Sequence, residues 1–150
     1  MRSIKSNKYI LLVLLGLLIL ITGCSKKYIA DGPSMAPTIN EGDTMIVDTG
    51  NDLNIDVDDL IILKIDDKKF VKRVVAVEGD TIKSDENAII INDKRYETFM
   101  LGDMNYPMEL TKDEFYVLGD NIDNSIDSRM FGVIKRTEIV GKIKSIKHKH

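Results

Sequence analysis

The chain has 150 residues, a usual length for a single domain, and 43% of them are hydrophobic with no Trp, which is typical of a folded domain with an aliphatic core. The first 24 residues carry three basic residues and no acidic one, so the other 126 hold 18 Lys and Arg against 24 Asp and Glu, a balance that excludes a generally basic nucleic-acid-binding protein. The single Cys excludes an intrachain disulfide. The two His residues, His148 and His150, both lie at the chain end, which disfavours a zinc or iron–sulfur site and a Ser-His-Asp triad.

Residues 9–25 form an uncharged, strongly apolar segment. As a helix they would be roughly 25 Å long, slightly short of the ~30 Å hydrocarbon core of a bilayer. The basic residues before them favour a cytoplasmic N-terminus; they are Arg2, Lys5 and Lys8. We therefore predict a cytoplasmic segment at 1–8, a transmembrane anchor or signal segment at 9–25, and an extracytoplasmic domain at 26–150.

A second interpretation of the apolar segment is a cleaved signal sequence, since a charged start followed by an apolar run is the secretory pattern. The residues Ile21-Thr22-Gly23-Cys24 resemble the lipobox of bacterial lipoproteins, in which Cys24 would be lipidated and would become the new N-terminus. Both interpretations hold the domain at the outer face of the membrane, next to membrane lipid.

Beyond residue 30 the chain alternates short β-rich runs with turn signals, and it shows no long helical period. Strands are expected at 44–47, 60–65, 70–77, 88–91, 115–118, 133–134 and 139–146. This pattern predicts the all-β class, built as packed sheets or a partly closed barrel. Residues 97–114 are the least regular part and are expected to form a surface excursion.

Ser34 stands between two prolines in the segment Gly32-Pro33-Ser34-Met35-Ala36-Pro37-Thr38. This spacing favours a stiff, extended loop and excludes a helix interior. A Ser hydroxyl is a poor nucleophile until a neighbouring base takes its proton, and both His residues lie at the chain end. Ser34 therefore belongs either to an ordinary solvated turn or to a site in which a carboxylate or a Lys activates it.

Lys72 is the candidate base, because it lies in an otherwise apolar strand at 70–77. With a period of two, one face of this strand carries Phe70, Lys72, Val74 and Ala76. Burial among apolar groups disfavours the ammonium and can lower the pKa of a Lys from about 10.4 to roughly 7–8, whereas the guanidinium of Arg73 stays protonated. The alternative is that Lys72 reaches solvent from a strand edge.

A dense polar loop at 119–132 follows an apolar strand. Its acidic residues are spaced like those of a calcium loop, but the Gly and the terminal Glu of an EF-hand are missing, so no metal is expected. Asp127 and Arg129 can form an ion pair that braces the loop. Ser125 can hydrogen-bond a neutral Lys amine and orient it.

Together these segments resemble the bacterial type I signal peptidases, which are membrane-bound serine proteases with a Ser/Lys dyad. Four motifs stand in the family's order across about residues 30–145: the Ser34 segment, the strand motif at 42–47, the Lys72 motif at 72–80, and the loop at 119–132, which contains Asp120, Asn121, Ser125, Asp127 and Arg129. The chain departs from the family at Glu78, where Pro is common, and at Gly32, where some relatives have a Ser that completes the oxyanion hole.

The resemblance implies a compact domain of antiparallel sheets and a peptidase that needs no cofactor. Ser34 would attack the scissile carbonyl, Lys72 would take its proton, and the backbone N–H of Ser34 would donate to the oxyanion. The implied supporting residues are Ser125, which would orient Lys72, the loop-bracing pair Asp127 and Arg129, and Met35, Asp120 and Asn121. Substrates would be secreted preproteins with small residues such as Ala before the cut, bound in extended form along the site edge.

The motifs thus indicate a signal peptidase that acts at the outer face of the cytoplasmic membrane. Two other functions stay open on the sequence: a specialised Ser/Lys processing peptidase of similar core, and a non-enzymatic surface lipoprotein whose β-domain binds a partner. Replacing Ser34 and Lys72 by Ala separates these classes: an enzyme loses turnover and keeps its fold, whereas a binding protein keeps both its fold and its binding activity.

Overall fold

The computed structural model describes residues 24–99, 101–102 and 105–149. Within these ranges no helix is both long enough and apolar enough to cross a membrane. The predicted membrane segment lies outside the described residues except for its last two, of which Cys24 is exposed and Ser25 begins a strand. The anchor, its boundaries and the lipidation of Cys24 therefore stay predictions.

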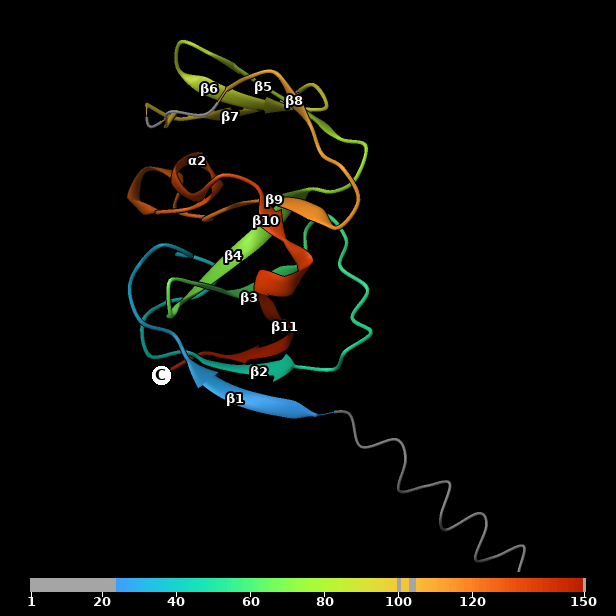
Figure 1. Cartoon of the computed structure of the whole chain (residues 1–150). Coiled ribbons are helices and arrows are strands. Elements are labelled where there is room, and N and C mark those ends of the chain that lie inside the picture. Colours follow the sequence, from blue (N-terminus) through green and yellow to red (C-terminus); the bar gives the residue numbers. More distant parts are fainter. Residues whose placement is uncertain (1–23, 100, 103–104, 150) are drawn as a thin grey trace, which may run out of the picture.

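Two antiparallel sheets make up the described part of the chain (Figure 1). The seven-stranded sheet has the order β1-β2-β11-β3-β4-β9-β10, with β1 Ser25–Ile29, β2 Thr44–Asp48, β3 Leu60–Ile65, β4 Lys68–Ala76, β9 Glu114–Leu118, β10 Ile134–Lys135 and β11 Ile139–Lys147. The four-stranded sheet has the order β7-β6-β5-β8, with β5 Thr81–Asp85, β6 Ala88–Ile91, β7 Lys94–Glu97 and β8 Met108–Glu109. The prediction of an all-β fold of antiparallel sheets is confirmed.

The remaining elements are short helical turns near the chain's polar loops. They are η1 (Ile122–Asn124), α2 (Ser128–Phe131) and η2 (Arg136–Glu138). Figure 1 shows the four-stranded sheet at one end of the molecule and β1 at the other. The first two turns lie in the predicted polar loop at 119–132, so this loop is more ordered than its composition suggests.

The strands that the sequence analysis missed are those with little buried surface. In β1 no residue is buried, and in β5 only Ile82 is, so neither shows the alternation by which a half-buried strand is recognised. The expectation of a surface excursion at 97–114 is wrong in two places. Thr98 and Leu110 are 3% and 2% exposed, and Leu110 packs into the core under the four-stranded sheet.

The central strand β4 does not keep a period of two along its whole length. Its register against β9 shifts between Val74 and Ala76, which is the signature of a bulge. Val74 packs in one core cluster with Phe115, whereas Ala76 packs in another with Ile82. The prediction that Val74 and Ala76 share a face is therefore wrong, and the bulge lets one strand contribute to the cores of both sheets.

Candidate active site

Ser34 lies in the connection between β1 and β2, which is closed at its base by backbone hydrogen bonds. The N–H of Ala30 donates to the carbonyl of Asp43 (2.8 Å), and the N–H of Gly42 donates to the carbonyl of Ala30 (2.9 Å). We call residues 30–43 the nucleophile loop. Because its two ends are tied together and Pro residues flank Ser34, few backbone conformations are open to it.

Two apolar side chains fasten the nucleophile loop to the core. Met35 and Ile39 are 3% and 1% exposed, and they pack with Met45, Val47 and Ile62. Burying a side chain of this size contributes about 1.5–3 kcal/mol. Met35, predicted as a supporting residue, thus lies under the loop, while Ser34 stays half-exposed above it.

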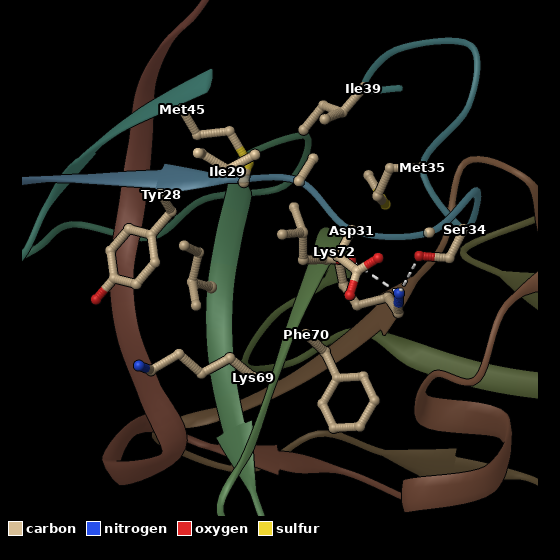
Figure 2. A pocket seen from close by; sticks show the side chains of 14 residues that line it. Tyr28, Ile29, Asp31, Ser34, Met35, Ile39, Met45, Lys69, Phe70 and Lys72 are labelled. Atoms are coloured by element: carbon tan, nitrogen blue, oxygen red, sulfur yellow. Dashed lines mark hydrogen bonds between the residues drawn. The ribbon is translucent and has the colours of Figure 1, made fainter. Parts of the chain in front are cut away.

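Lys72 extends from β4 toward Ser34 and is 2% exposed. Its Nζ lies 2.8 Å from Ser34 Oγ and 2.8 Å from the carbonyl oxygen of Val71, as Figure 2 shows. The two residues are 38 positions apart in the sequence, and the sheet brings them within hydrogen-bond distance. This geometry meets the first requirement for a nucleophile and its general base.

The surroundings of Lys72 favour its neutral form. Burial lowers the pKa of Lys72 to about 8; the charges of Asp127 and Asp120 oppose this shift, and that of Arg129 adds to it. A free amine at this position has a lone pair that can accept the Ser34 proton, which an ammonium lacks. A substantial fraction of Lys72 is therefore a usable base near pH 8.

The segment that follows β9 holds the nucleophile loop from the other side. The backbone N–H of Asn121 donates to Ser34 O (3.1 Å), and its side-chain amide donates to Pro33 O (3.1 Å). A Cβ added at Gly119 would lie 2.1 Å from Ser125 Oγ and 2.6 Å from Ser34 O, so only glycine fits this approach. Asn121, predicted as a supporting residue, thus contacts the backbone on both sides of the Pro33–Ser34 bond.

Asp120 forms a bidentate ion pair with Arg73, the neighbour of Lys72 on β4. The guanidinium Nη2 and Nε lie 2.7 Å and 2.8 Å from the two carboxylate oxygens. Arg73 holds the pKa of Asp120 below its ordinary value although burial alone would raise it. The pair ties the strand that carries Lys72 to the segment that carries Asn121.

Asp127 and Arg129 form the ion pair that the sequence predicts, and both side chains are completely buried, at 0% and 1% exposed. Arg129 Nε and Nη2 each lie 2.8 Å from a carboxylate oxygen. Asp127 also caps α2 by accepting from the N–H of Arg129, and it accepts from the N–H of Gly119 at 3.0 Å. Arg129 reaches across to Thr98 Oγ1 at 2.7 Å, so this pair joins the polar loop to the four-stranded sheet.

Replacing Arg129 by Met should be strongly destabilising, because it leaves the Asp127 carboxylate buried without its partner. Breaking a buried pair in this way costs about 3–5 kcal/mol of unfolding free energy, which urea denaturation of the folded domain would measure. The matched control is Arg95→Met, which removes the exposed ion pair with Asp85 and should leave the urea midpoint nearly unchanged. Equal midpoints for the two variants would contradict a bracing role of Arg129.

Ser125 lines a cavity together with Ser34 and Lys72, but it does not make the contact that the resemblance implies. Its Oγ is buried and has no hydrogen-bond partner among the described residues. Lys72 Nζ instead contacts Ser34 Oγ and Val71 O. The hydrogen bond from Ser125 to Lys72 is therefore absent from the described part of the chain, because the Lys72 side chain reaches toward the nucleophile loop.

A cavity of about 140 Å³ opens beside Ser34 and Lys72. Its inner wall is apolar and comes from Ala30, Met35, Ile39, Met45 and Ile62. Residues 69–72 of β4 line it as well. Among the residues that the structure describes, this part of β4 pairs with β3 alone, because pairing with β9 begins at Arg73. Figure 2 shows the Ser34 and Lys72 side chains meeting at one side of this cavity. The site therefore combines a hydroxyl, a buried amine, a small cavity with an apolar inner wall, and a strand edge that no described residue pairs with.

The sequence analysis missed two residues that hold the site together. Arg73 binds Asp120 from 47 positions away, and Thr98 binds Arg129 from 31 positions away. From the sequence, Arg73 stands out only as a neighbour of Lys72 that cannot act as a base, because its guanidinium stays protonated. No local pattern around Thr98 signals its contact, because its partner Arg129 lies in α2, which only the tertiary structure brings close to Thr98.

The family model described as "Signal peptidase, peptidase S26" matches residues 3–147. Signal peptidase I P of Bacillus subtilis subsp. natto is 31% identical, with 91% of this chain and 87% of the relative covered. Signal peptidase I U of Bacillus subtilis strain 168 is 32% identical, with coverages of 77% and 72%. The crystal structure of a signal peptidase I from Enterococcus faecalis V583 superposes with a TM-score of 0.45 at 19% identity, over 60% of this chain and 97% of that one.

Proposed function

The chain belongs to the signal peptidase family, peptidase S26, and is a serine endopeptidase; from this premise we propose that Ser34 and Lys72 are the dyad with which it removes signal peptides from secreted preproteins. The single observation that supports this assignment best is the 2.8 Å contact between Lys72 Nζ and Ser34 Oγ in a buried setting. The alternative of a binding lipoprotein leaves this contact and the family match without an explanation.

The proposed reaction begins with neutral Lys72, which takes the proton of Ser34 as Oγ attacks the scissile carbonyl. The bond to the leaving amine then breaks, the lysine ammonium returns the proton to that amine, and an acyl-enzyme remains on Ser34. A water molecule activated by Lys72 releases the acyl group. The N–H of Ser34 is a candidate oxyanion donor, since no described residue accepts a hydrogen bond from it.

The cavity with the apolar inner wall of Ala30, Met35 and Ile62 supports a preference for small residues before the cut. At about 140 Å³ it is smaller than the ~300–1,000 Å³ of pockets for drug-sized ligands. An extended peptide that pairs with the unpaired edge of β4 would place alternate side chains toward it. We infer that Ala or a residue of similar size is favoured at the position that enters the cavity.

The proposed location is the outer face of the cytoplasmic membrane. An anchor at 9–25, with the short segment 1–8 in the cytoplasm, would run straight into β1, because Ser25 is also the first residue of that strand. The domain that contains Ser34 and Lys72 would then lie close to the bilayer from which signal peptides emerge. A single anchor or a lipid on Cys24 would serve this purpose equally, and the intact mass of the purified protein distinguishes them.

The assignment is tested with the purified, detergent-solubilised chain and a preprotein whose signal peptide ends in Ala-x-Ala. The expected result is one cut after the last Ala, read from the N-terminus of the product. A folded protein that leaves several such preproteins intact, or that cuts them elsewhere, would overturn the proposed substrate class.

Turnover in this assay should rise with pH around 8. Only neutral Lys72 accepts the Ser34 proton, and the pKa of Lys72 is about 8, so the active fraction is about one tenth at pH 7 and about nine tenths at pH 9. The expected measurement is a roughly tenfold increase of kcat/KM across this range, with an apparent pKa near 8. An increase that begins only near pH 10.4, the ordinary value for Lys, would contradict a base whose pKa is lowered by burial.

A further inference from the structure

Asp43 is a buried carboxylate that the proposed reaction does not use. It is 2% exposed and lies at the base of the nucleophile loop, one residue before β2. Its carboxylate accepts three hydrogen bonds, from Asn40 N (2.9 Å), His148 Nδ1 (2.7 Å) and Lys149 N (2.8 Å). Two of these three donors belong to the residues that follow β11, more than 100 positions away in the sequence.

The same residue is hydrogen-bonded to the part of the loop that leads to Ser34. Asp43 O accepts from the N–H of Ala30, and Gly42 N–H donates to Ala30 O. Ala30 lines the cavity beside Ser34. A displacement of Asp43 would therefore move both a wall of the cavity and the backbone that carries the nucleophile.

The side chain of Lys149 adds a second contact at this point. Its Cδ lies only 2.8 Å from the place where a Cβ would stand on Gly42, whose φ is +87°. The acidic residues Asp31 and Glu41 line the same surface groove as Lys149. The residues after β11 thus pack against the nucleophile loop, and they place the positive charge of Lys149 in a groove that two acidic residues also line. Figure 1 shows this end of the chain beside β1 and β2.

We propose that residues 148–149 form a clamp that, through Asp43, positions the nucleophile loop for catalysis. His148 is a positioning residue in this account, because it touches neither the substrate nor the reacting atoms. With the clamp closed, Ser34 Oγ is held at its contact distance from Lys72; with the clamp open, the base of the loop moves. The inference rests on the proposed function and adds a requirement for residues outside all four family motifs.

The test uses the full chain with His148→Ala, which removes the Nδ1 contact, and His148→Asn, whose side-chain amide can donate from nearly the same place. The control is Lys144→Ala. Lys144 lies on β11 and forms an ion pair with Asp48 of β2, so this substitution removes a nearby ion pair without changing the contacts of Asp43. We expect His148→Ala to lower kcat/KM by roughly fivefold to tenfold per active site, because misplacing a reacting group is costly. His148→Asn should recover most of this loss, and Lys144→Ala should match the wild type.

Hydrogen–deuterium exchange of residues 30–43 is a second readout that does not depend on turnover. In His148→Ala the amides of Ala30 and Gly42 should exchange faster, while those of β3 and β4 stay unchanged. Wild-type kcat/KM in His148→Ala, a loss without faster exchange in the loop, or a failure of Asn to rescue would each overturn the clamp. If the wild type itself does not cleave, the proposed function fails, and the exchange comparison still decides whether residues 148–149 hold the loop.

Discussion

Ser34→Ala is expected to abolish cleavage of preproteins, with a fall in kcat of at least about a thousandfold. The substitution removes the Oγ that lies 2.8 Å from Lys72 Nζ, and no His in the described residues is placed to activate water in its stead, since His148 binds Asp43. The backbone contacts of the loop involve Ser34 O rather than its hydroxyl, so the folded structure should persist. Cleavage is measured by product formation per mole of folded protein.

The control for this variant is Ser145→Ala, an exposed serine on β11, which should cleave at the wild-type rate. Circular dichroism and the urea midpoint establish that both variants are folded. Residual cleavage above a few per cent in Ser34→Ala would mean that another group attacks the carbonyl. That result would remove Ser34 from the reaction, although the family assignment would stand.

Lys72→Met is expected to reduce kcat to a similar extent while it preserves or raises stability. Met keeps the length and apolar stem of Lys but has no amine to accept the Ser34 proton. Burial disfavours the charged form of Lys72, so an apolar side chain of similar volume removes a desolvation cost. Loss of activity together with an unchanged or higher urea midpoint is the expected signature of a residue kept for chemistry.

Lys64→Met provides the matched control, because Lys64 lies on β3 and its one ion pair among the described residues is with exposed Asp67. It should leave both turnover and the pH profile as in the wild type. Cleavage by Lys72→Met at even a tenth of the wild-type rate would contradict its role as the general base. A large drop in its urea midpoint would contradict the argument from desolvation.

The sequence was sufficient for the fold class and for the strands that bury a face. Strands such as β3, with three of six residues buried, carry enough apolar residues to be recognised. The exposed edge strand β1 and the two-residue β8 carry too few buried apolar residues to be recognised. The bulge in β4 could not be predicted either, because it depends on which residues of β9 stand opposite. Its effect is that every later residue of the strand points to the face opposite to the one that a period of two predicts.

The central pair of the site could be predicted from chemistry, whereas most of its supports could not. A Ser between prolines and a Lys in an apolar strand are unusual enough to be noticed singly, and the family motifs connect them. The ion pair of Asp127 and Arg129 is local, so spacing predicts it. By contrast, Arg73, Thr98 and the Asp43–His148 contact join segments that only the tertiary structure brings together, and the position of Ser125 Oγ depends on side-chain packing.

The most direct test of the central claim is to trap the acyl-enzyme on Ser34. The purified protein is mixed with an activated ester of an Ala-x-Ala peptide, quenched with acid and digested with trypsin; Ser34 is the only serine in the tryptic peptide 28–64. We predict one acyl group per protein at Ser34, formed faster at pH 9 than at pH 7 and missing in Ser34→Ala and Lys72→Met. Efficient cleavage of preproteins with no acyl group at Ser34 under any of these conditions would contradict the Ser/Lys dyad.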